Sequence, residues 1–591
     1  MIFFMHEQKE QLSQARHSCA HLLAAAVKQL WPGAKNAIGP AIEDGFYQDF
    51  DMGEVKISES DFEQIEKKMR EILKTWGQFE VKEVSLEQAQ KDFADNPYKL
   101  ELIQDFGKEG KTITENNPGN FLDLCKGGHS DDPQKELQHF KLLKIAGAYW
   151  RGDEKRQMLT RIYGTCFPAQ KELDNYLVML EEAKKRDHRK LGKELDLFTF
   201  SDLIGKGLPL WTHRGATIRR ELENFVVAEE LRRGYLHVIT PELAKVDLYR
   251  KSGHFPYYKN TMYPPMQIDE EELILRPMTC PHHFMLYQDK KRSYRELPMR
   301  IAELARLFRY EKSGELTGMM RVRSFCLADA HIICMPEQVK GELTDVLDLV
   351  EYMCSVFGLV KGKDFSYRLS LGDRENTEKY YKNDAAWDEG EETLRAILQE
   401  RGAPFAEAQN EAAFYGPKID IQMRNVLGKE DTAFTVQYDF CMPERFDLRY
   451  IDKDGTEKQP IVIHRSSIGA IERTFAFLIE HYAGAFPLWL APVQVQFVPV
   501  SEKHREAVKT QAVDFHANGI RVVVDETDET VGNKIRKSVS QKIPYIVVFG
   551  DKEAAGEDWV IRIRGQEKQE VIQKEAFIAR VLHDIATKRI F

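Results

Sequence analysis

The chain has few cysteines and no long apolar segment. Eight cysteines are scattered over 591 residues, which excludes a small disulfide-stapled scaffold and favours reduced thiols or single metal ligands. No apolar run comes near the roughly 18 residues that a membrane-spanning helix needs. The first residues also lack the basic start of a secretory signal. We therefore expect no membrane partner, and the cytoplasm as the compartment.

Clustered positive charge is also missing. The net charge is −10, and no run of five or more like charges marks a tail. A protein that coats nucleic acid needs clustered Lys and Arg, so DNA is not an expected partner. An RNA partner stays open, because an acidic body can carry a local basic surface.

The length predicts several domains, because one core rarely exceeds roughly 100 to 200 residues. Strands and turns follow a helical pattern near the N-terminus, which is typical of an α+β domain. A heavily charged helical linker precedes a central block whose extended segments and helices predict an antiparallel sheet with helices packed on it. Strand and helix then alternate, as in an α/β domain. The expected boundaries are 1–167, 168–193, 194–488 and 489–591.

Arginines and one glutamate gather around a turn in the central block. Glu311 follows Arg309 by two positions, so strand alternation predicts that both side chains project from one face. Arg321 follows the turn, and Arg473 begins a helical pattern further along. Guanidinium groups bind phosphates well, which points to a nucleotide site. Each arginine alone is more often a surface ion pair.

Several segments occur in an order that resembles one known family. They are RPMTC, MRVRSF, DAHIIC, FYGPKID, TVQYDF and VIHRSSIGAIER, and they resemble the class II aminoacyl-tRNA synthetases and, among them, bacterial-type threonyl-tRNA synthetases. The resemblance covers nearly the whole chain and implies a class II antiparallel sheet flanked by helices. It also implies an ATP site in which Mg²⁺ accompanies the phosphates, although no acidic motif identifies the ligands of that ion. The ATP-binding residues would be Arg309, Glu311, Arg321, Phe325 and Arg473, and all but Phe325 would be catalytic.

Cys280, His331 and His464 are 51 and 133 residues apart, too far for a finger-like metal knuckle. Spacing alone is weak evidence for zinc, but the resemblance implies one catalytic zinc on these three residues. Three protein ligands leave an open position for substrate. A metal that binds both an amine and a hydroxyl would distinguish threonine from valine, which an apolar pocket does poorly. The neighbours His282, His283 and Cys334 are expected to pack or to support the ligands.

Three further residues would contact the amino acid. The resemblance gives this role to Asp329, Tyr415 and Gln437, although Tyr415 and Gln437 would equally suit ordinary buried hydrogen-bonding positions. The chain departs from the family at positions around the ligands, which puts the detail of their surroundings in doubt. These departures are Phe308, Tyr310, Lys312, Leu327 and Ala470.

A second cluster of chemistry-bearing residues lies near the N-terminus. Two histidines four apart and a Cys-x-x-x-His segment indicate a zinc site from residue types alone. The resemblance implies instead an editing domain that hydrolyses seryl-tRNA without requiring metal. Serine lacks only one methyl of threonine, worth on the order of 1 kcal/mol, so a second site must remove it. The metal alternative stays open for these residues, which are His17, His21, Asp123, Cys125 and His129.

The last hundred residues resemble an anticodon-binding domain. Glu553 and Arg562 match positions that contact anticodon bases, although a solvated loop and an edge strand would explain them as well. Thr530 stands where a lysine is common. Only sixteen residues precede His17, so the family's small ubiquitin-like leader domain is expected to be missing, by lineage or by truncation.

The resemblance therefore implies an enzyme that activates threonine with ATP, transfers it to tRNA(Thr) and hydrolyses mischarged seryl-tRNA(Thr). A homodimer is the usual assembly. Two alternatives are an editing-only deacylase and a non-catalytic RNA-binding paralogue, and ATP–pyrophosphate exchange with threonine would separate them.

Overall fold

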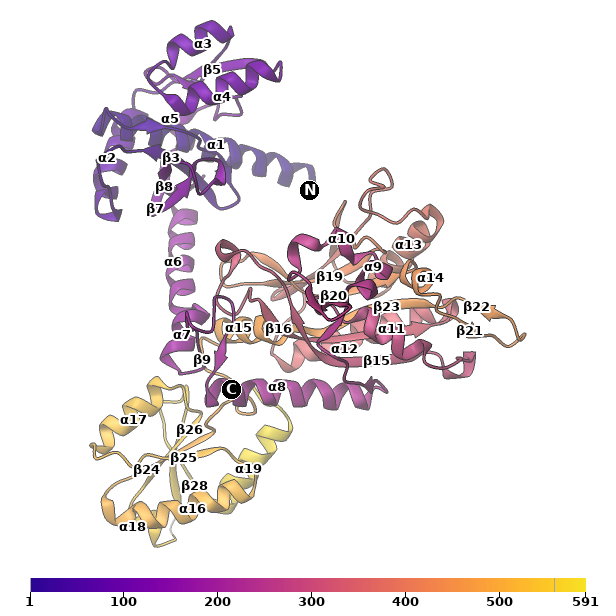
Figure 1. Cartoon of the computed structure of the whole chain (residues 1–591). Helices are drawn as coiled ribbons and strands as arrows, with labels where there is room; N and C mark the ends of the chain where they lie inside the picture. The colour runs from indigo at the N-terminus through magenta and orange to yellow at the C-terminus, as the bar shows by residue number, and fades with distance from the viewer. Residues whose placement is uncertain (1, 557, 591) are drawn as a thin grey trace. The chain divides into compact units, whose positions relative to one another are not determined.

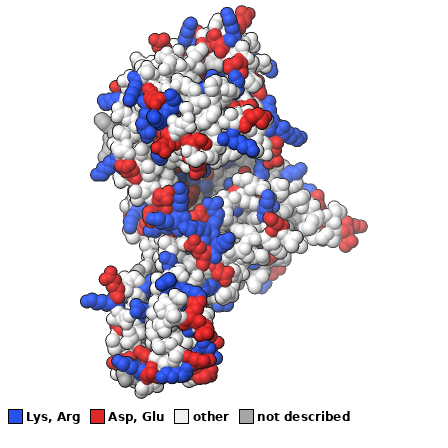
Figure 2. All heavy atoms as spheres, turned by 90° about the vertical axis from the view of Figure 1, so that its left-hand side faces the viewer, with Lys and Arg blue, Asp and Glu red and all other residues white. Residues whose placement is uncertain are grey.

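The computed structural model describes residues 2–556 and 558–590. The chain forms two compact units, Met1–Leu180 and Glu181–Phe591, which divide within helix α6 (Gln170–Arg186) (Figure 1). No helix in the described part is long and apolar enough to cross a membrane. On the face drawn in Figure 2, acidic and basic side chains are interspersed.

The first unit is built on the long helix α1 (Ile2–Leu30). Its alanine-rich centre favours helix and is buried against a five-stranded sheet in the order β1-β3-β8-β7, with β2 paired to β3. Helix α2 (Phe62–Leu73) also packs against α1. The strands are β1 (Lys35–Asn36), β2 (Ala41–Ile42), β3 (Gly45–Asp51), β7 (His139–Tyr149) and β8 (Met158–Phe167).

A smaller layer completes this unit. Three antiparallel strands in the order β4-β5-β6 are joined by α3 (Leu86–Asp92) and α4 (Pro97–Lys108). Asn96 caps α4, because its side chain accepts hydrogen bonds from the N–H groups of Tyr98 and Lys99. The last strand leads directly to Cys125, so this layer brings the Cys-x-x-x-His segment toward α1. The strands are β4 (Glu80–Val84), β5 (Ile113–Asn117) and β6 (Asp123–Leu124).

The second unit contains an eight-stranded sheet in the order β11-β15-β16-β23-β20-β19-β17-β18. Only the two edge pairs, β11 with β15 and β17 with β18, are parallel. The predicted antiparallel sheet flanked by helices is therefore confirmed, and its main helices are α8 (His213–Arg232), α12 (Val339–Val356), α13 (Asp384–Glu400) and α15 (Ile471–His481). The strands are β11 (Leu236–His237), β15 (Met299–Phe308), β16 (Ser324–Cys334), β17 (Phe365–Ser370), β18 (Phe405–Ala408), β19 (Lys418–Arg424), β20 (Glu430–Asp439) and β23 (Ile461–Ala470).

The register of this sheet aligns polar residues that are far apart in the sequence. His331 on β16 lies opposite His464 on β23, and His464 in turn lies opposite Gln437 on β20. Asp329 lies opposite Ser466 in the same pair of strands. Because side chains alternate along a strand, Asp329 and His331 share one face of the sheet. Strand pairing thus assembles one site from three segments.

The end of the chain is an α/β domain, as expected from its alternating pattern. Its five strands run in the order β25-β24-β26-β27-β28, parallel in the first three and antiparallel in the last two. Apolar side chains from alternate positions of these strands, and so from one face of the sheet, meet α16 and α19 in one core. The elements are β24 (Val495–Pro499), α16 (Arg505–Ala517), β25 (Val522–Val524), α17 (Val531–Ser540), β26 (Tyr545–Phe549), α18 (Asp551–Ala554), β27 (Trp559–Ile563), β28 (Glu570–Ile572) and α19 (Lys574–Ala586).

Candidate active sites

A cavity of about 550 Å³ opens over the central sheet. Nearly every residue predicted for ATP, threonine or zinc lines it, and the exception, His331, is fully buried in the sheet beneath. The structure therefore brings the three predicted groups into one place. The lining residues from those groups are Cys280, Arg309, Glu311, Arg321, Phe325, Asp329, Tyr415, Gln437, His464 and Arg473.

The three predicted metal ligands converge. One potential ligand atom from each of Cys280, His331 and His464 lies within 4.8 Å of the others, and all three residues are buried. The histidines meet through the strand register, whereas Cys280 is the first residue of helix α11 (Cys280–Gln288). Burial lowers the pKa of His331 well below its usual value, which keeps its imidazole neutral and able to coordinate a metal.

In each of the two histidines, one ring nitrogen contacts a polar side chain and the other has no hydrogen-bond partner among the described residues. The His331 Nδ1 lies 2.8 Å from the Nδ1 of His283, whose Nε2 lies 3.3 Å from Glu303. The His464 Nε2 lies 2.5 Å from the Oδ2 of Asp439. Within the described residues, the buried His331 Nε2 and His464 Nδ1 have no hydrogen-bond partner.

Metal-bound histidines usually donate their second ring nitrogen to such partners. If Glu303 accepts from His283, then His283 accepts from His331, and the His331 Nε2 is left with its lone pair. Two unpaired imidazole nitrogens beside a thiol suit Zn²⁺, so the residues fit the metal that the sequence predicted.

The neighbours expected to pack or to support the ligands take separate places. His283 contacts His331 from one helical turn beyond Cys280, while His282 lies 3.0 Å from the Tyr249 hydroxyl. Cys334 is buried at the end of β16. Asp439 and Glu303 were not predicted from the sequence. The position of Asp439, two residues after Gln437 on one strand, was the available signal.

The predicted threonine contacts lie beside the metal ligands. Tyr415 donates a short hydrogen bond to the side-chain oxygen of Gln437, and its ring stacks on His464 with centroids 4.9 Å apart. Asp329 is buried, and burial raises the pKa of its carboxyl. All three groups face the cavity, so a small polar ligand there would meet a carboxyl, a phenol and an amide.

One prediction about the arginines is wrong. Arg309 and Glu311 do not project from one strand face, because β15 ends at Phe308 and the chain turns so tightly that the Glu311 N–H donates to the Arg309 carbonyl, 3.0 Å away. The Glu311 carboxylate instead binds the Arg321 guanidinium at 2.7 Å and 2.8 Å. The alternation rule fails here because it holds only while the backbone stays extended.

Arg309, Arg321 and Arg473 nevertheless line the same cavity. The Arg309 guanidinium lies 5.2 Å from the Phe325 ring centroid, and among the described residues it has no ion pair. Arg473, in the first turn of α15, donates to the carbonyls of Met320 and Thr432 at 3.3 Å and 3.1 Å. Burial, and then the positive charge of Arg473, lower the pKa of Arg309. Positive groups gathered in this way bind an anion favourably.

Two of the departures from the family have a visible structural setting. Ala470 is the N-cap of α15 and offers no side-chain hydrogen bond to the helix, where serine would supply one. Leu327 lines the cavity and adds apolar surface to its wall. Neither residue displaces a candidate ligand.

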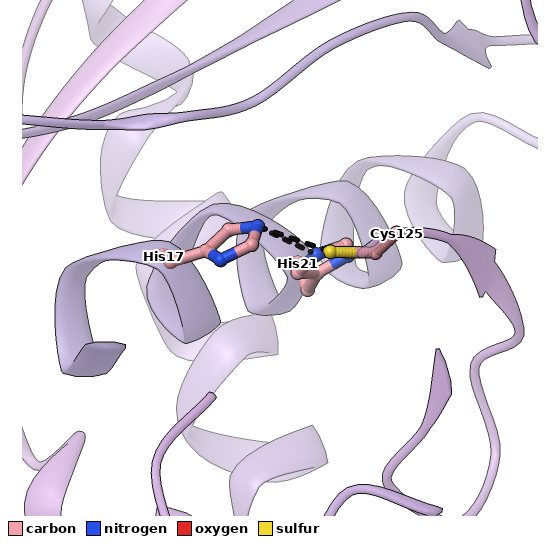
Figure 3. Close-up of side chains that lie close together, drawn as sticks. All are labelled: His17, His21 and Cys125. Carbon is pink, nitrogen blue, oxygen red and sulfur yellow. Dashed lines mark hydrogen bonds between the residues drawn. The ribbon is translucent and has the colours of Figure 1, made fainter. Parts of the chain in front are cut away.

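The N-terminal cluster is also assembled. His17 and His21 lie on successive turns of α1 and are directed toward Cys125 (Figure 3). The Cys125 Sγ and the His21 Nε2 each lie 3.3 Å from the His17 Nε2. Asp123 holds the other His21 nitrogen at 2.9 Å. The His129 ring stacks on Phe79, with centroids 4.0 Å apart.

This cluster has unusual electrostatics. Burial would raise the pKa of the Cys125 thiol, but the surrounding imidazoles lower it to about 3. Burial likewise opposes the charged form of His21, but its hydrogen bond with Asp123 raises its pKa to about 9. Lys99, 2.7 Å from Asp123, keeps that carboxylate ionised. At neutral pH the cluster therefore contains a thiolate beside an imidazolium.

A cavity of about 380 Å³ adjoins these groups and is lined by His17, His21, Asp123 and Cys125. Its wall also carries apolar side chains such as Leu102. A small polar group attached to a larger ligand would therefore reach the thiolate and imidazoles. The geometry suits either hydrolysis or metal binding, the two alternatives that the sequence left open.

The candidate anticodon residues occupy different surroundings. The Glu553 carboxylate accepts a hydrogen bond from the Gly550 N–H at 2.9 Å and so caps α18. Arg562 lies on β27, and its buried Nε has no partner among the described residues. Thr530 is the N-cap of α17.

Comparison with known proteins agrees with this architecture. Residues 261–482 match the family described as "tRNA synthetase class II core domain (G, H, P, S and T)", and residues 494–583 match "Anticodon binding domain". A threonine–tRNA ligase of Anoxybacillus flavithermus is 49% identical over 98% of this chain and 90% of that protein. Its counterpart in Geobacillus kaustophilus is 48% identical over 100% of this chain and 90% of that protein.

Solved structures are similar as well. The RNA-binding domain of threonyl-tRNA synthetase from Cryptosporidium parvum is 34% identical, with a TM-score of 0.63 over 67% of this chain and 97% of that chain. A putative threonyl-tRNA synthetase from Aeropyrum pernix is 29% identical, with a TM-score of 0.61 over 68% of this chain and 97% of that chain. The resemblance found in the sequence is thus confirmed, and the chain belongs to the threonine–tRNA ligase family of class II aminoacyl-tRNA synthetases.

Proposed function

We propose that this chain activates threonine with ATP, transfers it to tRNA(Thr) and clears seryl-tRNA(Thr) at a separate site. The observation that carries the proposal is a single cavity lined both by the candidate metal ligands Cys280 and His464 and by three arginines, Arg309, Arg321 and Arg473. Such a cavity places an amino acid and a nucleotide side by side. Membership of the family agrees with this arrangement.

In the first step, the threonine carboxylate attacks the α-phosphorus of ATP and pyrophosphate leaves. Arg309 meets the charge that develops there, because it lines the cavity without an ion pair among the described residues. Arg473 holds the terminal phosphates, and Phe325 stacks on the adenine. Fixed cations contribute most where negative charge grows in the transition state, and close positioning contributes the rest.

Cys280, His331 and His464 would hold Zn²⁺, which supplies a Lewis acid able to bind the amine and hydroxyl of threonine together. Asp329, Tyr415 and Gln437 then accept or donate hydrogen bonds to the same groups. Valine has no hydroxyl, so it would leave buried polar groups without a partner, at a cost of about 1 to 3 kcal/mol each.

Serine escapes this selection, because it has both polar groups and is smaller. The N-terminal cluster would therefore hydrolyse seryl-tRNA(Thr), with the Cys125 thiolate and the imidazoles of His17, His21 and His129 orienting the water and the ester. Asp123 positions His21 through the 2.9 Å contact. The thiolate and the imidazoles can activate the water without a metal, because they supply the charged groups themselves.

The remaining assignments complete the proposal. Glu553 and Arg562 contact the anticodon, Mg²⁺ accompanies ATP, and the enzyme works as a homodimer in the cytoplasm. The editing domain spans 1–167, the helical linker 168–193, the catalytic domain 194–488 and the anticodon-binding domain 489–591.

Threonine-dependent ATP–pyrophosphate exchange tests the activation step. Exchange with threonine, absent with valine, is the expected result. An editing-only deacylase would hydrolyse seryl-tRNA without exchange, and a non-catalytic paralogue would do neither, so either outcome would replace the proposal.

A further inference from the structure

The geometry points to a second zinc site in this chain, formed by His17, His21 and Cys125, whose occupation blocks the N-terminal cavity. The three ligand atoms lie within 4.8 Å of one another. The blocking effect rests on the proposed editing function, whereas the binding of zinc does not. The site is thus an inhibitory one, distinct from the zinc expected at Cys280.

The hydrogen bonds made by the Nδ1 atoms of His17 and His21 determine which ring nitrogen carries the proton. The His21 Nδ1 lies 2.9 Å from a carboxylate oxygen of Asp123, and the His17 Nδ1 lies 3.3 Å from the carbonyl oxygen of Gly128. Both partners only accept hydrogen bonds, so both Nδ1 atoms carry a proton. In the neutral rings both Nε2 atoms therefore hold lone pairs.

Those lone pairs point at each other. The two Nε2 atoms are 3.3 Å apart, and the Cys125 sulfur lies 3.3 Å from the one on His17. The two Nε2 lone pairs and the sulfur repel one another at such distances unless a positive charge lies among them. That charge can be a proton on one of the rings, or a metal ion bound to all three atoms. Carboxylate and carbonyl partners behind metal-bound histidines are the usual outer arrangement of a zinc site.

His129 lies beside the three ligands. Its ring centroid lies 4.7 Å from that of His17 and 4.9 Å from that of His21. It is not among the residues whose ligand atoms lie within 4.8 Å of one another. One thiolate and two imidazoles would therefore leave the fourth position of a tetrahedral zinc open.

Occupation would block hydrolysis for a direct reason. The metal would bind the same lone pairs that orient the water and the ester. His17, His21 and Cys125 also line the cavity that would receive the seryl group. Zinc and substrate would therefore compete. Chelators are then expected to leave editing intact or to raise it.

Cobalt binding to the full chain tests the site without using tRNA. In Cys280→Ala, which lacks the thiol of the other site, we expect Co²⁺ to give one thiolate-to-metal absorption band per chain, displaced by Zn²⁺. Adding Cys125→Ala should remove the band, and adding His17→Ala should weaken Co²⁺ binding at least tenfold. Cys19→Ala, which removes a buried thiol from the same helix, is the matched control and should keep the band. No band in Cys280→Ala, or a band that survives Cys125→Ala, would overturn the site.

Deacylation of preformed seryl-tRNA(Thr) by the unmodified chain tests the blocking effect. We expect saturating Zn²⁺ to slow it at least tenfold, with full recovery on adding a chelator. A normal rate with Zn²⁺ bound would overturn the inhibition. A chain that deacylates nothing even with chelator would refute the proposed editing function, and the cobalt band would still decide the metal site.

Discussion

Replacing Asp439 by asparagine should weaken metal binding at the proposed zinc site. The carboxylate is fully buried and uses both oxygens: Oδ1 accepts from the N–H groups of Cys441 and Met442 at 2.9 Å each, and Oδ2 lies 2.5 Å from the His464 Nε2. In the asparagine variant the side-chain oxygen still accepts from the two backbone N–H groups, so the amide NH₂ faces His464. The NH₂ group and the His464 Nε2–H group are then both donors and cannot hydrogen-bond to each other.

The imidazole can relieve that clash by moving its proton to Nδ1. The Nδ1 is the atom that lacks a partner among the described residues, and a proton there removes the lone pair that a metal needs. Loss of a partner behind a metal ligand typically costs about 10- to 100-fold in affinity or activity, which corresponds to about 1.4 to 2.7 kcal/mol. We expect a loss toward the upper end, because the substitution also forces the wrong tautomer.

Elemental analysis and competition with a chromophoric chelator would measure the zinc content and affinity, and threonine-dependent pyrophosphate exchange would measure activation. Asp447→Asn is the matched control, because the same chemical change occurs on a side chain that is 74% exposed. Zinc bound by Asp439→Asn as tightly as by the parent chain would refute the tautomer argument.

Four further outcomes are expected. Arg309→Ala and Arg473→Ala should each lose at least about 100-fold in exchange, since a charge-assisted contact to a developing anion is worth about 3 kcal/mol; near-normal rates in both would refute the nucleotide assignment. Cys280→Ala should lose zinc and threonine activation while ATP binding, measured by calorimetry, stays largely intact. Cys125→Ala should charge threonine normally but accumulate seryl-tRNA in a misacylation assay, whereas correct clearance would exclude a role for the thiol. Because the pKa of Cys125 is lowered to about 3, its alkylation by iodoacetamide should stay nearly constant between pH 8 and pH 5, as followed by mass spectrometry, whereas an ordinary thiol slows about tenfold per pH unit below its pKa near 8.5.

The fold class was predictable because each domain has its own pattern. Alternating strands and helices identify the last domain, and extended segments interrupted by helices identify the central sheet. Strand order was not predictable from these patterns. His331 and His464 are 133 residues apart in sequence and yet lie opposite each other in the sheet, because β23 inserts between β16 and β20 and pairs with both.

The surroundings of the site were the least predictable part. Sequence spacing predicted that Arg309 and Glu311 project from one strand face. The strand ends just before them, however, so the loop that follows determines the direction of both side chains. The salt bridge between Glu311 and Arg321 depends on that loop. Likewise, alternation places Asp439 on the same strand face as Gln437, but its contact with His464 depends on the pairing of β20 with β23. Such contacts arise from tertiary packing, which overrides local periodicity.

Residue types alone could not separate the two Cys/His clusters, but their charges do. Burial and the carboxylates of Asp329 and Asp439 raise the pKa of the Cys280 thiol well above its usual value, so that thiol ionises only if a metal supplies positive charge. At Cys125 the imidazoles supply that charge themselves, and the thiolate exists without metal. In the proposed function, the Cys280 cluster therefore needs zinc, whereas the Cys125 cluster does not. A chelator should therefore abolish threonine activation and leave seryl-tRNA hydrolysis intact in the same sample, and loss of both activities together would contradict this division.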